Sequence, residues 1–361
     1  MRTRLTELVG VEHPIVQTGM GWVSGSRLVT ATARAGGLGI IASATMTYPE
    51  LETAIREVKE RTDAPFGVNL RADAEDSQAR VELLIREGVR VASFALAPRK
   101  DMIARFKDAG VLVIPTVGAA RHAEKVAAWG ADAVIVQGGE GGGHTGGVAT
   151  TLLLPSVVRA VDIPVVASGG FFDGSGLAAA LAYGASGIAM GTRFLLTSDS
   201  SVPESVKRAY LGNGLDGTVV TTKVDGIPHR VLRTELVDSL ERTRGVRTLA
   251  HAAVNAFRFR KLTGIGWRAL MGEGFALVRS GDRTLTQVLM AANSPMLLRA
   301  GLVQGNTQAG VLASGQVVGM IDDLPSVAEL VERIVLEAEH RLDELRVVSS
   351  RQVPRPSSGT Q

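Results

Sequence analysis

The stretch Ala133–Gly147, which reads AVIVQGGEGGGHTGG, is the segment around which the fold of this chain is predicted. It begins as an apolar run typical of a buried strand and continues as a glycine-rich loop with four reactive side chains, Gln137, Glu140, His144 and Thr145. Glycine runs are costly in backbone entropy, so we expect one where the backbone closely approaches a ligand. His144 can exchange protons near neutral pH. We interpret the segment as a cofactor loop with His144 as the catalytic residue; the alternative is a glycine linker with an incidental histidine.

Eight short apolar runs alternate with helix-type patterns through the first part of the chain. They cover residues 14–18, 39–42, 66–70, 89–96, 111–117, 133–137, 164–168 and 187–190. Near-continuous apolar strands separated by helices indicate parallel strands that are covered on both faces. Eight such units close a (β/α)₈ TIM barrel. A doubly wound open sheet is the alternative, and the absence of a GxGxxG fingerprint after an early strand favours the barrel.

The pattern changes after residue 200. We expect residues 201–309 to form a mainly helical lid subdomain over the barrel mouth, with short irregular or β-like segments at 218–222 and 224–228. Residues 310–347 then return to the barrel of residues 1–200 and include a final amphipathic helix at 327–347. The remaining residues, 348–361, are rich in Ser, Pro and Gly and are expected to be a disordered tail.

Composition bounds the class of protein. The 361 residues include 45% hydrophobic and 21% charged residues, as in ordinary globular proteins. There is no cysteine, which excludes thiolate chemistry and fits the cytoplasm. We find neither a signal-peptide pattern at the start nor a run that could span a membrane. A net charge of +3 and an aromatic content of 4% argue against a nucleic-acid partner.

Two further glycine clusters follow the last two predicted strands. They place Gly169 and Gly170 after one strand, and Gly191 and Thr192 after the next. In barrels, the loops at these adjacent positions often hold a phosphate with backbone N–H groups and a helix N-terminus. We therefore predict a phosphate cradle at these four residues; the alternative is a pair of tight turns.

Other strand ends carry candidate contacts for a flat ring. The segment Gly19, Met20 and Gly21 leaves room for a ring after the first strand, although it also fits a simple turn. The amides of Asn69 and Gln137, at the ends of the third and sixth strands, could bond the edge of a ring system.

The histidines predict no metal centre. None of the six has HxxxH-type spacing or a recognisable second ligand beside it in the sequence. Residue order alone leaves a Ser-His-Asp triad open, but the GxSxG elbow is absent.

The segment Gln137–Gly146 resembles the QGxEAGGHxG signature of the nitronate monooxygenase (2-nitropropane dioxygenase) family, which includes the FabK-type enoyl-ACP reductases. Residues 36–40, 167–170 and 190–194 are similar to its other motifs, in the same order. The resemblance implies an FMN-binding TIM barrel with a helical second domain and a catalytic role for His144. The FMN contacts that it implies, or that the same loops supply, are Gly19, Met20, Gly21, Asn69, Gln137, Gly142, Gly143, Gly169, Gly170, Gly191, Thr192 and Gln316. Two departures, Gly19 where a proline usually precedes the methionine and Gly141 where alanine is usual, weigh against nitronate as the substrate.

The whole chain is most similar to an actinobacterial branch of that family, whose members are flavin-dependent dehydrogenases of a CoA thioester in steroid ring breakdown. The expected reaction is therefore oxidation of a CH–CH bond beside the thioester of a bulky cyclic acyl-CoA, with NAD(P) as a candidate electron partner. Residues 229–283 contain eleven basic and five acidic residues, including Arg258, Arg260 and Lys261, which suits a ligand with several phosphates as well as a solvated helix face. Nitronate oxidation and a non-catalytic phosphate- or nucleotide-binding barrel are the alternatives. A homodimer is a candidate assembly.

Overall fold

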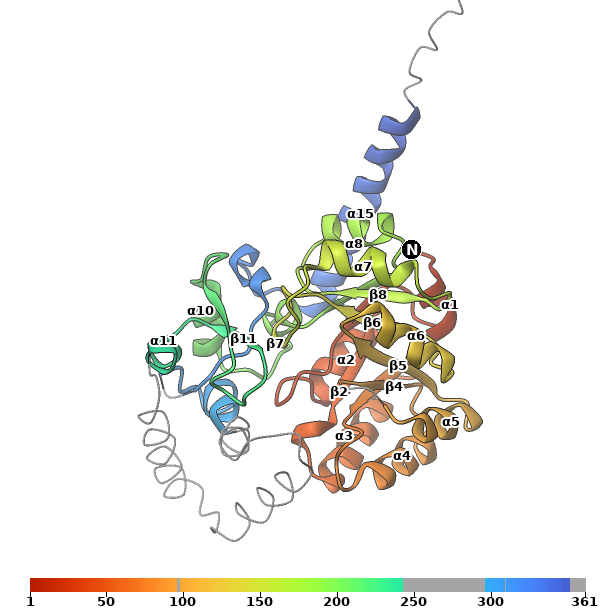
Figure 1. Ribbon diagram of the computed structural model, residues 1–361, viewed down its shortest axis with the longest axis horizontal. Coiled ribbons are helices and arrows are strands. Elements are labelled where there is room, and N and C mark those ends of the chain that lie inside the picture. The colour runs from red at the N-terminus through yellow and green to blue at the C-terminus, as the bar shows by residue number, and fades with distance from the viewer. Residues whose placement is uncertain (96–97, 243–295, 309, 351–361) are drawn as a thin grey trace, which may run out of the picture.

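The computed structural model describes residues 1–95, 98–242, 296–308 and 310–350. Its centre is a closed barrel of eight parallel strands, surrounded by helices (Figure 1). In barrel order the strands are β1 (Ile15–Gln17), β2 (Leu38–Ala42), β3 (Phe66–Leu70), β4 (Val91–Phe94), β5 (Leu112–Val117), β6 (Val134–Gln137), β8 (Val165–Ser168) and β9 (Gly187–Met190). The predicted (β/α)₈ TIM barrel is confirmed, and each of the eight predicted apolar runs overlaps one barrel strand.

The burial of the strands explains why their sequences are apolar throughout. Every residue of β2, β3, β4, β8 and β9 is buried, because one face lines the barrel interior and the other contacts the helices. The barrel closes between β1 and β9, where Gln17 lies opposite Met190. All parallel strands end at the same rim, so the loops after β1, β3, β6, β8 and β9 surround one barrel mouth.

The helices between the strands form the outer layer. They are α1 (Arg4–Val9), α2 (Ser26–Arg34), α3 (Tyr48–Arg61), α4 (Ser77–Arg86), α5 (Lys100–Asp108), α6 (Ala120–Ala128), α7 (Thr150–Val158), α8 (Gly174–Ala182) and the short α9 (Thr192–Leu195). A 3₁₀ turn, η1 (Ser43–Thr45), precedes α3. Helix α3 begins at a capping box, in which Thr47 and Glu50 satisfy each other's backbone N–H groups.

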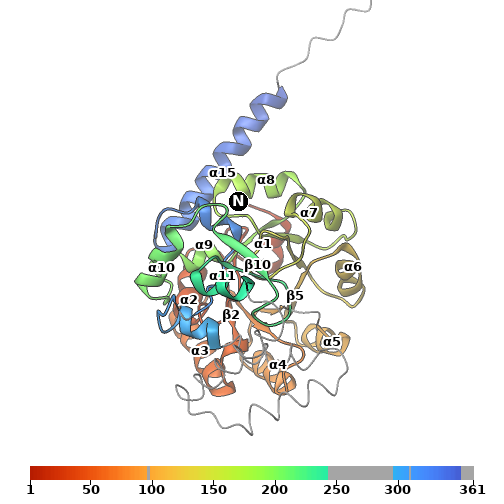
Figure 2. The same ribbon diagram turned by 60° about the vertical axis from the view of Figure 1, so that its left-hand side comes forward.

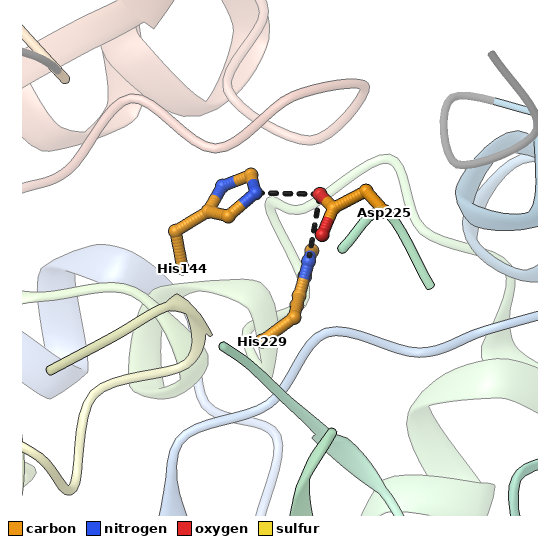
Figure 3. Close-up of side chains that lie close together, drawn as sticks. All are labelled: His144, Asp225 and His229. Atoms are coloured by element: carbon orange, nitrogen blue, oxygen red, sulfur yellow. Dashed lines mark hydrogen bonds and ion pairs between the residues drawn. The ribbon is translucent and has the colours of Figure 1, made fainter. Parts of the chain in front are cut away.

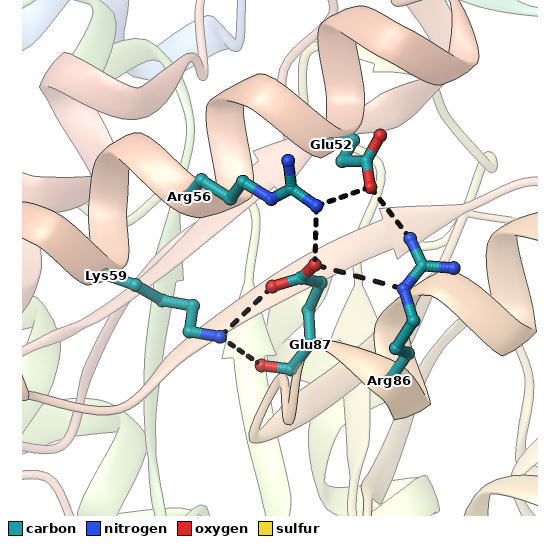
Figure 4. A network of polar contacts seen from close by, with 5 residues as sticks. All are labelled: Glu52, Arg56, Lys59, Arg86 and Glu87. Carbon is teal, nitrogen blue, oxygen red and sulfur yellow. Dashed lines mark hydrogen bonds and ion pairs between the residues drawn. The ribbon is translucent and has the colours of Figure 1, made fainter.

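A polar network joins the outer faces of α3 and α4 (Figure 4). Glu52 accepts hydrogen bonds from both Arg56 and Arg86 at 2.8 Å, and Lys59 contacts Glu87 at 3.1 Å. The hydrogen bond from Lys59 outweighs partial burial and lowers the pKa of Glu87. Because the cations are about half exposed, this network orients two barrel helices without forming a site.

In both views, the described part of residues 201–309 lies over the barrel mouth (Figures 1 and 2). Its described part contains α10 (Glu204–Leu211), β10 (Thr218–Thr221), β11 (His229–Leu232), α11 (Glu235–Arg242) and a helical stretch at 296–302. Strands β10 and β11 form an antiparallel sheet with β7 (Gly143–His144), which comes from the glycine-rich loop.

Residues 218–222, expected to be irregular or β-like, contain β10, whereas residues 224–228 are irregular and the second strand starts at His229. Residues 222–226 form a turn, closed by a hydrogen bond from the Gly226 N–H to the Thr222 carbonyl, with Gly226 at a left-handed φ of 83°. The described part of a segment that we expected to be mainly helical therefore combines three helical stretches with two short strands. The rest of that segment, residues 243–295, lies outside the described residues.

The chain returns to the barrel through the 3₁₀ helix η2 (Gln316–Met320) and ends in α15 (Val327–Ser350), which packs against α8 and projects beyond the barrel (Figure 1). This helix continues three residues past the expected end at 347. Residues 351–361 of the expected disordered tail lie outside the described residues. Within the described residues, no helix combines the length and apolar character needed to cross a membrane.

Candidate functional site

The glycine-rich loop is held at the barrel mouth by backbone hydrogen bonds. After β6 it turns back as β7, in which His144 pairs with His229 and Gly143 pairs with Arg230 of β11. The Thr145 N–H donates to the carbonyl oxygen of Pro228 at 3.1 Å. The interpretation as a glycine linker is therefore wrong, because backbone pairing with the segment after residue 200 fixes the position of His144.

Part of the glycine content of this loop serves contacts within the protein. A Cβ on Gly142 would lie 2.5 Å from the Gly315 nitrogen, and a Cβ on Gly138 would lie 1.9 Å from Thr150 Oγ1. Gly143 has a left-handed φ of 73°. We predicted Gly142 and Gly143 as cofactor contacts. The structure gives each a reason to be glycine in the fold itself, through close backbone packing in one case and conformation in the other.

The four residues of the predicted phosphate cradle come together at the ends of β8 and β9. Gly169 and Gly170 both have left-handed φ angles, 95° and 84°. Within the described residues, neither the Gly170 N–H nor the Gly191 N–H donates to another group of the protein. These unpaired donors at adjacent strand ends fit a phosphate group. The hydroxyl of Thr192 accepts a hydrogen bond from the Gly315 N–H at 2.8 Å, and its predicted contact with a phosphate stays a prediction.

The predicted ring-contact segment lies beside the cradle. A Cβ on Gly191 would be 3.4 Å from Met20 Sδ, and a Cβ on Gly19 would be 2.7 Å from the Cβ of Asn69. A Cβ on Gly21 would be similarly close to the Thr45 side chain. The loops after β1, β3 and β9 therefore meet, as one ligand spanning ring and phosphate contacts would require.

Trp22, which follows Gly21, is the only described non-glycine residue with positive φ, 61°, a conformation that is strained for a bulky side chain.

The three predicted amide contacts differ in their surroundings. Asn69 is buried beside Gly19, and its Nδ2 lies 3.4 Å from Ser93 Oγ. Gln137 Nε2 donates to the carbonyl oxygen of His144 at 2.8 Å, so it supports the loop. Gln316 joins the loop through its backbone N–H, which donates to the Glu140 carbonyl at 2.9 Å, while its side chain lies 3.3 Å from the Leu215 carbonyl.

His144 lies beside two residues that the sequence analysis did not select, Asp225 and His229 (Figure 3). Its Nε2 is 2.6 Å from Asp225 Oδ2, and the same oxygen is 3.6 Å from His229 Nδ1. The His144 side chain is 56% exposed, whereas the side chains of Asp225 and His229 are 8% and 3% exposed. The expectation that no histidine has a second plausible ligand nearby was wrong, because the fold brings these three side chains together. The Asp225-x-x-x-His229 spacing was the available sequence signal.

Burial by itself would raise the pKa of Asp225. The contacts with His144 and His229 outweigh burial, and the pKa of Asp225 is held well below its ordinary value. The carboxylate is therefore ionised at neutral pH and can only accept hydrogen bonds.

The predicted substrate contacts Arg258, Arg260 and Lys261 lie outside the described residues, so their role stays a prediction.

Fold and site together define a class, that of closed eight-stranded parallel barrels with glycine-rich strand ends and a histidine at one rim. Within this class the chain belongs to the nitronate monooxygenase family, whose family model matches residues 2–337. The family consists of flavin-type oxidoreductases. The family resemblance noted in the sequence is therefore confirmed.

Three similar proteins give this membership more detail. The chain is 69% identical to a Mycobacterium tuberculosis protein, with 94% of this chain and 96% of that protein covered, and 67% identical to a Rhodococcus jostii protein, with 96% and 98% covered. Both carry the name (3aS,4S,5R,7aS)-5-hydroxy-7a-methyl-1-oxo-octahydro-1H-indene-4-carboxyl-CoA dehydrogenase. Among solved structures, FabK from Thermotoga maritima superposes with a TM-score of 0.79 at 34% identity and covers 96% of this chain and 99% of its own.

Proposed function

We propose that this protein is an FMN-dependent oxidoreductase that removes hydrogens from a CH–CH bond beside the thioester of a bulky cyclic acyl-CoA, in steroid ring catabolism. The observation that carries the proposal is the position of His144 at the barrel mouth, on a loop that extends from β6 and is held by β11. The names of the two relatives at 67% and 69% identity support an indene-type acyl-CoA as the substrate class.

The rim residues fit FMN on two grounds. The N–H groups of Gly170 and Gly191, unpaired within the described residues, suit its one phosphate, and the segment Gly19–Gly21, which packs closely on Asn69 and Thr45 beside them, would offer its backbone to the ring. No second nucleotide-binding fingerprint, as FAD would need, occurs in the sequence. When bound, the flavin would supply hydride-accepting chemistry. Mass analysis of the cofactor released from the purified protein tests this assignment, and FAD would contradict it.

His144 is the group that would handle the proton. A hydrogen next to a thioester is acidic, and a positioned imidazole can take it as a general base. The half-exposed His144 ring can reach a bound substrate at the mouth, and its buried partner Asp225 would stabilise the protonated ring. Arg258, Arg260 and Lys261 remain proposed contacts for the CoA phosphates, NAD(P) remains a proposed electron partner, and the homodimer remains a proposed assembly.

The experiment that tests the proposal is anaerobic mixing of the purified flavoprotein with an indene-type acyl-CoA, the matching CoA-free acid and an alkyl nitronate. We expect bleaching of the flavin absorbance with the acyl-CoA and none with the free acid. Reduction by the nitronate alone would favour nitronate oxidation. A protein that carries no flavin at all would favour the non-catalytic binding barrel.

A further inference from the structure

The contact between His144 and Asp225 decides which nitrogen of the histidine can accept a proton. The distance of 2.6 Å between Nε2 and Oδ2 is a hydrogen-bond distance. The other carboxylate oxygen, Oδ1, accepts the N–H of Ile227 at 3.1 Å, so both oxygens are held. An ionised carboxylate has no proton to donate, and therefore Nε2 of His144 must carry the hydrogen. In the neutral ring the free lone pair is then on Nδ1, which points away from Asp225 (Figure 3).

The same three side chains have the donor types of a divalent metal site, and the ligand atoms lie within 4.8 Å of one another. Their spacing argues for hydrogen bonding instead. Two ligands of a tetrahedral zinc ion with bonds of about 2.0–2.1 Å lie about 3.3 Å apart. The 2.6 Å between His144 and Asp225 is clearly shorter than this separation. The cluster therefore fits a shared proton better than a shared metal ion.

His229 completes the surroundings of the pair. Its ring centroid is 4.7 Å from that of His144, and its side chain is 3% exposed. It limits the rotation of His144 and fills the space on the other side of Asp225. Arg230, the neighbour of His229 in β11, is bound to the Gly139 carbonyl rather than to Asp225.

We propose that Asp225 is the positioning residue for His144: it fixes the Nε2–H tautomer and makes Nδ1 the proton-accepting atom. This inference rests on the proposed function of His144 as a base. In the reaction, the C–H bond next to the thioester breaks, its proton passes to Nδ1, and its electron pair forms the enolate of the thioester. The Asp225 carboxylate stabilises the resulting imidazolium, and the hydride of the neighbouring carbon would leave to the acceptor that a bound flavin supplies. Because Asp225 lies in the turn before β11, the acid–base unit is complete only when the segment after residue 200 is in place.

The first test needs no substrate, and its main measurement is made on the wild-type protein. The flavoprotein is labelled with ¹⁵N-histidine, the His144 signals are assigned by their loss in His144→Gln, and the ring nitrogen shifts report the tautomer. We expect a protonated Nε2 and an unprotonated Nδ1 at a pH at which the ring is neutral. A protonated Nδ1 would overturn the proposal. So would stoichiometric binding of Zn²⁺ that is lost in Asp225→Asn, because a metal would then occupy the position of the shared proton.

The second test is kinetic. In Asp225→Asn the amide can turn its NH₂ group toward Nε2 and favour the wrong tautomer. We expect flavin reduction by the acyl-CoA to slow by about 10²–10⁴-fold. The pH profile of flavin reduction should also change, since the negative charge beside the His144 ring is lost. The matched control is Asp216→Asn, an exposed aspartate on the same segment. Equal pH profiles in Asp225→Asn and the control would refute the positioning role.

The two tests separate this inference from the proposed function. If no acyl-CoA reduces the flavin but the Nε2–H tautomer is found and is lost in Asp225→Asn, the function fails and the positioning stands. If the acyl-CoA reduces the flavin of wild type and Asp225→Asn at equal rates, the positioning fails and the function stands.

Discussion

The guanidinium of Arg230 donates two hydrogen bonds to the carbonyl oxygen of Gly139, from Nε at 3.2 Å and from Nη2 at 2.9 Å. Its third nitrogen, Nη1, donates to Thr218 Oγ1 at 2.9 Å. One side chain thus joins both strands of the β10–β11 hairpin to the glycine-rich loop. Burial lowers the pKa of Arg230, against the opposing effect of Glu140, but arginine remains charged at any physiological pH.

Replacing Arg230 by methionine should loosen the loop that carries His144. The Gly139 carbonyl would lose a charged donor, and hydrogen bonds to charged groups are worth about 1.5–3 kcal/mol each in stability. We expect the free energy of unfolding in urea to fall by about that amount and the amides of the loop to exchange faster. The control is Arg233→Met, whose exposed ion pair with Asp238 should contribute under about 1 kcal/mol. Equal effects of the two changes would contradict the role of Arg230.

Gly142→Ala should disturb the same loop from its other side. The added Cβ would lie 2.5 Å from the Gly315 backbone nitrogen, which cannot move as a flexible side chain would. Overpacking of this kind costs about 1–3 kcal/mol. In Gly146→Ala, the matched change in the same loop, the Cβ meets nothing within 4 Å, and the free energy of unfolding should change by less than about 0.5 kcal/mol. A Gly142→Ala protein as stable as Gly146→Ala would show that the returning segment is not packed on the loop.

Gly170→Val should expel FMN beyond what backbone strain explains. Gly170 has a φ of 84°, and a Cβ there would lie 3.7 Å from Glu140, so the valine side chain would enter the proposed phosphate cradle. The matched control is Gly110→Val, where φ is 74° and nothing lies within 4 Å. Both variants carry the left-handed strain of about 1–2 kcal/mol. Flavin content per protein should fall in Gly170→Val alone, and a fully loaded Gly170→Val protein would refute the placement of the phosphate.

A pH-dependent contribution to stability is expected from Asp323, which precedes α15. It accepts hydrogen bonds from the buried Arg193 at 2.8 Å and from Arg333 at 2.6 Å. Burial would raise the pKa of Asp323, but these hydrogen bonds outweigh it and the pKa is lowered. A lowered folded-state pKa means that the contribution is complete above the unfolded value of about 3.9 and is lost as the pH falls through the folded value.

Asp323→Ala should therefore lower the free energy of unfolding at neutral pH. It should also make that free energy depend less on pH in the acid range. It leaves the Arg193 charge, 2% exposed, without its carboxylate partner, and because Asp323 is itself 38% exposed and screened by solvent, the expected cost is about 1–3 kcal/mol. Asp322→Ala, the exposed neighbour, should cost less than about 0.5 kcal/mol. Urea unfolding of the three proteins across acid and neutral pH measures both effects. An Asp323→Ala protein with the wild-type pH dependence would show that the pair contributes nothing at neutral pH.

The barrel could be predicted because its strands are buried on both faces, which leaves apolar runs that are readable in isolation. The sequence also placed the loop of His144 and the glycine pair Gly169 and Gly170 at strand ends, since each follows a strand directly. The partners of His144 could not be found in the same way. Asp225 lies 81 residues further along the chain, and only the pairing of β7 with β11 brings it to Nε2.

The reasons for individual glycines were also hidden in the sequence. Gly142 was predicted as a cofactor contact, yet its neighbour is the backbone of Gly315, which returns from a distant segment. The same holds for Thr192, whose hydroxyl is used by the Gly315 N–H. A motif shows that a small residue or a hydroxyl is needed at a position, but it does not show whether a ligand or another part of the chain requires it.

The strongest single test of the site is His144→Ala. If His144 takes the proton next to the thioester, its loss should slow flavin reduction by the acyl-CoA by about 10²–10⁴-fold, the range of a positioned acid–base group. Flavin content should be nearly unchanged, because the proposed FMN contacts are glycine backbone and the side chains of other residues, not the imidazole of His144. His122→Ala, a change in the outer helix α6, is the control and should reduce its flavin at the wild-type rate. Anaerobic stopped-flow reduction, with cofactor occupancy measured alongside, gives both quantities. A fully loaded His144→Ala protein that is reduced as fast as wild type would show that the β7 histidine holds the hairpin and takes no part in the reaction.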